Sequence, residues 1–136
     1  MRTILIITMF TASLAYADWN DVRETRELEL DAQNIGILEI ESRSGSLEVT
    51  GDSESGRILV TAIIEVPDTS DEKAEKIIAK DLVLSLDQKG DTAVLKGYFD
   101  GGSWGWGDSP RVRLEVSMPS HLALSVNDTS GSIVVN

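Results

Sequence analysis

Residues 38–50 read LEIESRSGSLEVT, and this stretch contains the pattern that decides the fold. Apolar and polar residues alternate in 38–41 and again in 46–50, on either side of a polar turn at 42–45. Alternation with a period of two is typical of β-strands that bury one face. Residues 124–136, LSVNDTSGSIVVN, repeat this order, including the Ser-Gly-Ser that precedes the second strand. The sequence therefore predicts two copies of one strand–turn–strand unit.

The same alternation recurs along most of the remaining chain. It predicts further strands at 26–30, 57–66, 82–86, 92–99, 111–118, 122–126 and 132–135. In 57–66, Leu59 and Ile63 lie opposite the main apolar stripe, which predicts partial cover on both faces of that strand. Residues 88–91 predict a hairpin turn.

One segment, at about 70–80, has helical spacing instead. Ala74, Ile77 and Ile78 lie on one face of a helix drawn through it. The pattern predicts a short amphipathic helix that lies on a sheet. The fold class is therefore all-β with one short helix.

The first seventeen residues have the order of a secretory signal peptide. Arg2 is followed by a mainly apolar stretch at 4–15, and the last three of the seventeen are Ala-Tyr-Ala, an A-x-A cleavage pattern. Cleavage between Ala17 and Asp18 is predicted. The apolar stretch is too short to cross a bilayer as a helix, and the chain has no cysteine for lipidation. We expect a mature single domain at 18–136 that is periplasmic or secreted and does not span the membrane.

Composition excludes several classes of function. The chain has 136 residues, 12 Lys+Arg, 23 Asp+Glu, a net charge of −11, one histidine and no cysteine. Disulfide frameworks, thiolate metal sites and cysteine nucleophiles are thereby excluded. An acidic chain is unsuited to neutralising phosphates, so no nucleic-acid partner is expected. No motif indicates a cofactor, and none is expected.

The signal peptide, LEIESRSGSLEVTG at 38–51 and LALSVNDTSGSIVVN at 122–136 together resemble the bacterial adhesin-like family DUF4097, also described as adhesin domain-containing. The resemblance implies antiparallel strands that lead into β-solenoid-like (β-helix) rungs built on a repeated S-G-x-I/L-x-V pattern. It covers nearly all of the mature chain but corresponds to the N-terminal part of the family, so we expect a domain that is incomplete at its C-terminus. The family supplies no catalytic residues to transfer.

The most unusual segment is the glycine-rich loop at 100–110, DGGSWGWGDSP. Trp104 and Trp106 have two interpretations. They form a stacking platform for a sugar or a peptide, or they fold back and seal one end of the core, as largely buried tryptophans do. The second interpretation is favoured, and the first makes these two residues the candidate ligand-binding site.

Candidate chemical groups are sparse. Asp52 with Glu54, or Asp100 with Asp108, offer oxygen ligands for calcium, but solvated turn carboxylates are the favoured interpretation and no metal site is predicted. His121 is the single imidazole, and no nucleophile motif accompanies it. We expect no catalytic residues.

The predicted function is therefore a non-catalytic, exported envelope or surface interaction module that binds an envelope component, either polysaccharide or protein. The alternative is a carbohydrate-active hydrolase or glycan-binding domain that uses carboxylates and the loop tryptophans.

Overall fold

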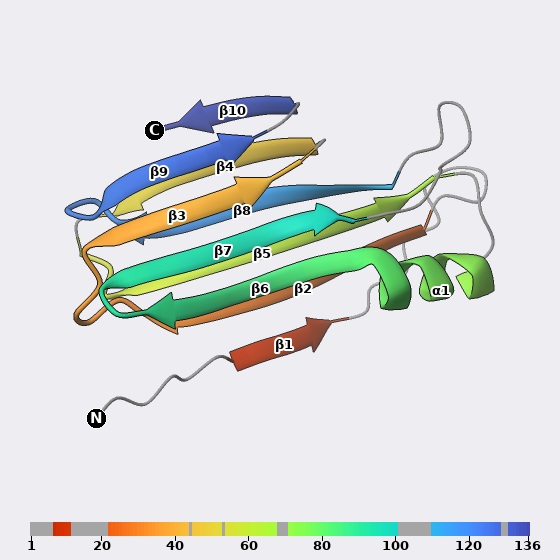
Figure 1. Cartoon of the computed structure of the whole chain (residues 1–136), viewed down its shortest axis with the longest axis horizontal. Coiled ribbons are helices and arrows are strands. Elements are labelled where there is room, and N and C mark those ends of the chain that lie inside the picture. Colours follow the sequence, from red (N-terminus) through yellow and green to blue (C-terminus); the bar gives the residue numbers. More distant parts are fainter. Residues whose placement is uncertain are drawn as a thin grey trace.

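The computed structural model describes residues 7–11, 22–43, 45–52, 54–67, 71–100, 110–128 and 131–136. Two open β-sheets pack face to face, with one short helix at one end (Figure 1). The larger sheet contains, in spatial order, β1 (Ile7–Thr11), β2 (Val22–Asp31), β5 (Arg57–Val66), β8 (Arg111–Pro119), β4 (Gly45–Asp52) and β10 (Gly131–Val135). The smaller sheet contains β6 (Leu82–Lys89), β7 (Thr92–Phe99), β3 (Ile37–Ser42) and β9 (Ala123–Asp128). The helix is α1 (Asp71–Asp81).

Each sheet is antiparallel on one side and parallel on the other. In the larger sheet β1, β2, β5 and β8 pair antiparallel, whereas β8, β4 and β10 pair parallel. In the smaller sheet β6 and β7 pair antiparallel, whereas β7, β3 and β9 pair parallel. The prediction of an all-β fold with one short helix is confirmed.

Three pairs of consecutive strands, β3–β4, β7–β8 and β9–β10, have one member in each sheet: β3, β7 and β9 end, and β4, β8 and β10 begin, at the same end of the molecule, on the right in Figure 1. The β3–β4 pair lies between the other two in both sheets. The sequence repeat is reproduced in the pairing, because Leu38 is opposite Leu124 and Gly45 is opposite Gly131. The two copies therefore lie side by side in register.

The backbone conformation and close packing at Gly45 explain why the middle residue of the first Ser-Gly-Ser is glycine. Its φ is 143°, a conformation that residues with a side chain rarely adopt. A Cβ at this position would lie 2.2 Å from the carbonyl oxygen of Val112 on β8. The backbones of β4 and β8 therefore lie so close together here that only glycine fits at position 45.

The core lies between the sheets and follows the period-two pattern. On β5, Ile58 and Val60 are 0% and 1% exposed and point inward. Leu59 points outward and is 44% exposed, whereas Ile63, on the same outer face, is half-buried. The predicted partial cover of the second face of this strand therefore holds at Ile63 and is wrong at Leu59.

The helix and the hairpin follow the sequence closely. Ala74 and Ile78 of α1 are buried in the main core, as the helical spacing predicts. The antiparallel strands β6 and β7 join at the predicted turn, where Gly90 has a φ of 63°.

Strand β1 is not predicted by the sequence. It lies inside the predicted signal peptide and pairs antiparallel with β2 at the edge of the larger sheet. Removal of residues 1–17 would leave β2 as that edge.

Candidate functional site

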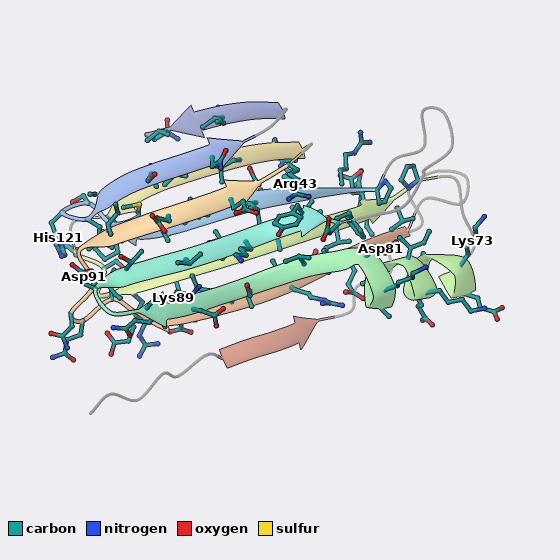
Figure 2. The ribbon with its side chains drawn as sticks, viewed as in Figure 1. Arg43, Lys73, Asp81, Lys89, Asp91 and His121 are labelled. Atoms are coloured by element: carbon teal, nitrogen blue, oxygen red, sulfur yellow. The ribbon has the colours of Figure 1, made fainter. Side chains whose placement is uncertain are left out.

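Three places concentrate chemical groups that could contact a partner. A shallow pocket lies at the end of the sheets that carries His121, a side-chain cluster surrounds Arg43 at the opposite end, and the edge formed by β9 and β10 is unpaired (Figures 1 and 2). Each has a different chemistry.

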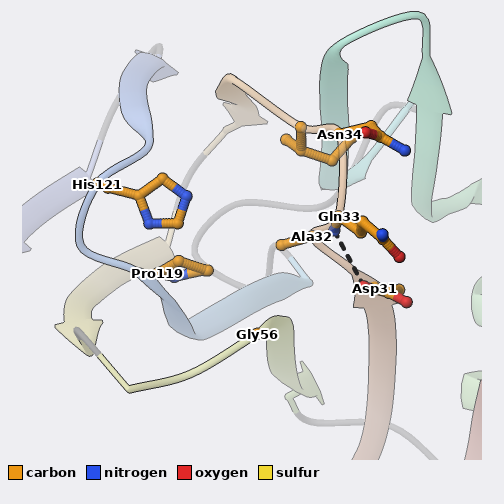
Figure 3. Close-up of a pocket in the computed structure, with 8 residues that line it drawn as sticks. Asp31, Ala32, Gln33, Asn34, Gly56, Pro119 and His121 are labelled. Atoms are coloured by element: carbon orange, nitrogen blue, oxygen red, sulfur yellow. Dashed lines mark hydrogen bonds between the residues drawn. The ribbon is translucent and has the colours of Figure 1, made fainter.

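The pocket has a volume of about 310 Å³ and opens between the β2–β3 loop, the β4–β5 turn and the β8–β9 turn (Figure 3). It is lined by Asp31, Ala32, Gln33, Asn34, Ile35, Gly56, Pro119 and His121. Among the described residues that line the pocket, the polar side chains are those of Asp31, Gln33, Asn34 and His121.

The β2–β3 loop that forms the pocket wall is held by its own hydrogen bonds. The Gln33 amide donates to Asp31 Oδ1 at 2.9 Å, and the Ala32 amide donates to the Gly56 carbonyl at 3.0 Å. Asn34 adopts the left-handed conformation, with a φ of 68°, which asparagine tolerates well. One carboxylate oxygen of Asp31 is therefore committed to the turn, while His121 is exposed on the opposite wall.

Arg43 anchors the second cluster at the far end of β3. Its guanidinium lies 4.1 Å from the centroid of the Tyr98 ring, a cation–π distance. Its nitrogens also lie 3.3 Å from Asp100 Oδ1 and 3.9 Å from Glu41 Oε2. Parallel pairing of β3 with β7 sets Ser42 opposite Gly97, which brings the next residues, Arg43 and Tyr98, together.

Tyr98 is only 7% exposed although it lies on the outer face of its sheet. Burial raises the pKa of its phenol above the usual 10.0, and a hydrogen bond to the Glu41 carboxylate raises this pKa further. The phenol is therefore a neutral hydrogen-bond donor. Arg43 pairs with the carboxylates of Glu41 and Asp100 and stacks on the Tyr98 ring. It therefore links β3 to β7, and the cluster has a structural role.

The third place is the edge of the β9–β10 pair, where Ile133, Val134 and Val135 are 45%, 48% and 58% exposed. On the neighbouring β4, Leu47 and Val49, which lie opposite Ile133 and Val135, are each 1% exposed. Equivalent positions of the repeat are thus covered in one copy and uncovered in the other.

Backbone groups of β10 are also free on this edge. The Asn136 amide donates to the Val49 carbonyl at 2.8 Å, and the Asn136 carbonyl accepts from Gly51 at 3.2 Å. Successive residues of a strand direct their backbone groups to opposite edges. The N–H and C=O groups of Ile133 and Val135 therefore face away from β4.

The sequence-predicted sites have mixed outcomes. Trp104 and Trp106 lie outside the described residues, as do Ala17 and Asp18, so the loop platform and the cleavage site stay predictions. Asp100 is described and pairs with Arg43 rather than standing as a free ligand.

Asp52 and Glu54 form a turn, in which the Glu54 amide donates to Asp52 Oδ1 at 3.0 Å. Across the described ranges, no group of three or more histidine and acidic side chains is placed to hold a metal ion.

Sequence reasoning missed the Arg43–Tyr98 contact and the exposure of 133–135. The contact depends on parallel pairing of β3 with β7, which leaves no signal in the sequence.

No family model, curated protein or solved structure matches this chain. Within the part of the chain that the structure describes, α1 is too short and too polar to cross a membrane, and no other helix is found there.

Proposed function

We propose that this chain is an exported, non-catalytic interaction module that binds a protein partner by strand addition at the free edge of β9 and β10. One observation carries the proposal: three consecutive apolar residues, 133–135, are about half exposed on β10, which pairs with β4 along one edge and with no described strand along the other. Contiguous exposed apolar residues mark interaction surfaces. An unpaired strand supplies the backbone donors and acceptors that an added strand needs.

The arrangement of the strand pairs supports this mode of binding. We regard β7–β8, β3–β4 and β9–β10 as successive turns of a short solenoid-like stack, as the family resemblance implies. In such a stack each unit buries its apolar stripe against the next. Among the described residues the outermost unit, β9–β10, has a neighbour on one side only, and an added strand would follow the same direction of stacking.

A peptide with the sequence of residues 38–50 tests the binding mode, because this segment already pairs in register with β9 and β10 inside the chain. A fluorescently labelled peptide should show increased anisotropy when the protein is added. Val135→Pro should weaken binding at least tenfold, since it removes an N–H that faces the free edge and places a ring there.

Two controls make this test specific. A peptide of the same composition with the alternation scrambled should not bind. Leu59→Thr should leave binding unchanged, because Leu59 is as exposed as Ile133 but lies on the outer face of a central strand. Equal binding of the scrambled peptide would contradict strand addition.

Export is tested separately. Bacteria that produce residues 1–136 should release the protein on periplasmic extraction or into the medium, with an N-terminus at Asp18 by mass spectrometry. Retention of the intact N-terminus in the cytoplasmic fraction would contradict the exported location.

A further inference from the structure

The outer face of the larger sheet gathers three arginines at one end, on the right in Figure 1. Glu65 of β5 lies opposite Arg23 of β2 on one side and Arg111 of β8 on the other. Arg113 follows two residues along β8 and shares this outer face, because the residues on either side of it are buried. Two residues of an extended strand span about 7 Å, and two strand spacings about 10 Å. The three guanidinium groups therefore lie within reach of one short linear ligand.

The carboxylates beside these arginines hold them only loosely. A nitrogen of Arg23 and a nitrogen of Arg111 each lie 3.7 Å from the same atom, Glu65 Oε2. Arg113 Nε lies 3.7 Å from Glu115 Oε2. These distances are longer than those of hydrogen bonds, so at these contacts the carboxylates attract the guanidinium groups without accepting from their N–H donors. The three arginine side chains are 50%, 56% and 57% exposed, which leaves the donors open to a ligand.

The local balance of charge favours an anion although the chain is acidic. Three guanidinium groups meet two carboxylates here, whereas the whole chain has a net charge of −11. The donors of arginine form a planar fork that matches two oxygens of a phosphate group. Exposed ion pairs contribute little free energy. A phosphate group, which can carry two charges, therefore competes well with single carboxylates for these donors.

We infer that the arginine cluster, Arg23, Arg111 and Arg113, binds the phosphate groups of a short linear anion, independently of the strand addition proposed above. The forks of Arg111 and Arg113 approach one phosphate group from neighbouring positions of a single strand. Arg23 reaches the next phosphate group from the far side of Glu65. Three cations spread over about 10 Å suit several linked phosphate groups better than one free phosphate ion.

A flat anionic membrane does not fit the same face. The neighbouring outward row is acidic, because Glu115 lies opposite Glu48 on one side and opposite Thr61 on the other, and Thr61 in turn lies opposite Glu27. This row lies about 7 Å from Arg113. A bilayer laid on the face would bring these glutamates against lipid phosphates, whereas a short anion at the arginine end avoids them.

Isothermal titration calorimetry with sodium tripolyphosphate tests this binding, with protein purified from bacteria that produce residues 1–136. The wild-type protein should bind one tripolyphosphate, more tightly than inorganic phosphate. Arg111→Gln and Arg113→Gln should each weaken binding about fivefold, the upper range for an exposed charge pair. Glu65→Gln should tighten binding, because it removes the carboxylate that competes for two of the arginines.

Two control variants make the same changes of charge elsewhere. Arg57→Gln removes an exposed arginine, paired with Glu29, that lies about 26 Å along β5 from Glu65. Screening over about 8 Å at physiological ionic strength should leave its tripolyphosphate affinity unchanged. Glu39→Gln removes an exposed carboxylate from the smaller sheet and should not tighten binding. Circular dichroism should verify the fold of each variant.

The outcomes that contradict the phosphate site are specific. Equal weakening by Arg57→Gln and Arg113→Gln would show a response to net charge rather than to the arginine cluster. A wild-type protein with no saturable heat of binding would have no such site. Tighter binding of a tetraglutamate peptide would assign the arginines to carboxylates. Equally tight binding to phosphatidylglycerol vesicles would assign them to a membrane surface.

Discussion

Replacing Gly45 with alanine is the sharpest test of how the strand pairs fit together. Gly45 begins β4 with a φ of 143°, and the added Cβ would lie 2.2 Å from the Val112 carbonyl oxygen and 3.1 Å from its carbon. Both atoms belong to the backbone of β8. Relief of the clash therefore requires β4 to move away from β8, because no flexible side chain can yield.

Two costs add in this variant. A residue with a side chain in a sparsely populated backbone region costs about 1–3 kcal/mol. Forcing an extra carbon into a well-packed site costs about 1–3 kcal/mol more. We therefore expect Gly45→Ala to lower the free energy of unfolding by about 2–6 kcal/mol, a large part of the stability of a small domain.

Urea unfolding followed by circular dichroism measures this loss, and Gly56→Ala is the matched control. Gly56 has no heavy atom within 4 Å of an added Cβ and no positive φ. Its substitution should change stability by no more than about 1 kcal/mol, through the entropy of the unfolded chain. Equal unfolding midpoints for the two variants would refute the close approach of β4 to β8.

Three further outcomes are expected. Deletion of residues 1–17 should leave strand-rich circular dichroism and cooperative unfolding, because β1 contributes one edge strand; loss of cooperative unfolding would make β1 part of the folded domain. Leu114→Ala should cost about 2–5 kcal/mol in urea unfolding because Leu114 is 0% exposed, whereas Leu59→Ala should cost less than about 1 kcal/mol. The pKa of Tyr98 is higher in the folded protein than the usual 10.0, so the phenol makes a constant contribution to the free energy of unfolding below about pH 10. This contribution should decline as the pH rises through the folded-state pKa. Melting temperatures of Tyr98→Phe should lack this decline, and parallel profiles for both proteins would contradict it.

Local pattern was sufficient for much of the fold. Period-two alternation located strands that bury one face, as β5 does with Ile58 and Val60 inward. Helical spacing located α1, whose Ala74 and Ile78 reach the core. The repeat was informative beyond its own residues, because the two copies pair with each other in register.

Long-range pairing was beyond the reach of these patterns. The β7–β8 pair comes between the two copies in sequence, yet in space it lies on the side of β3–β4 that faces away from β9–β10. Alternation states which residues face inward, and it carries no information on which strand is the neighbour. The Arg43–Tyr98 contact and the 44% exposure of Leu59 both depend on neighbours, so neither could be predicted.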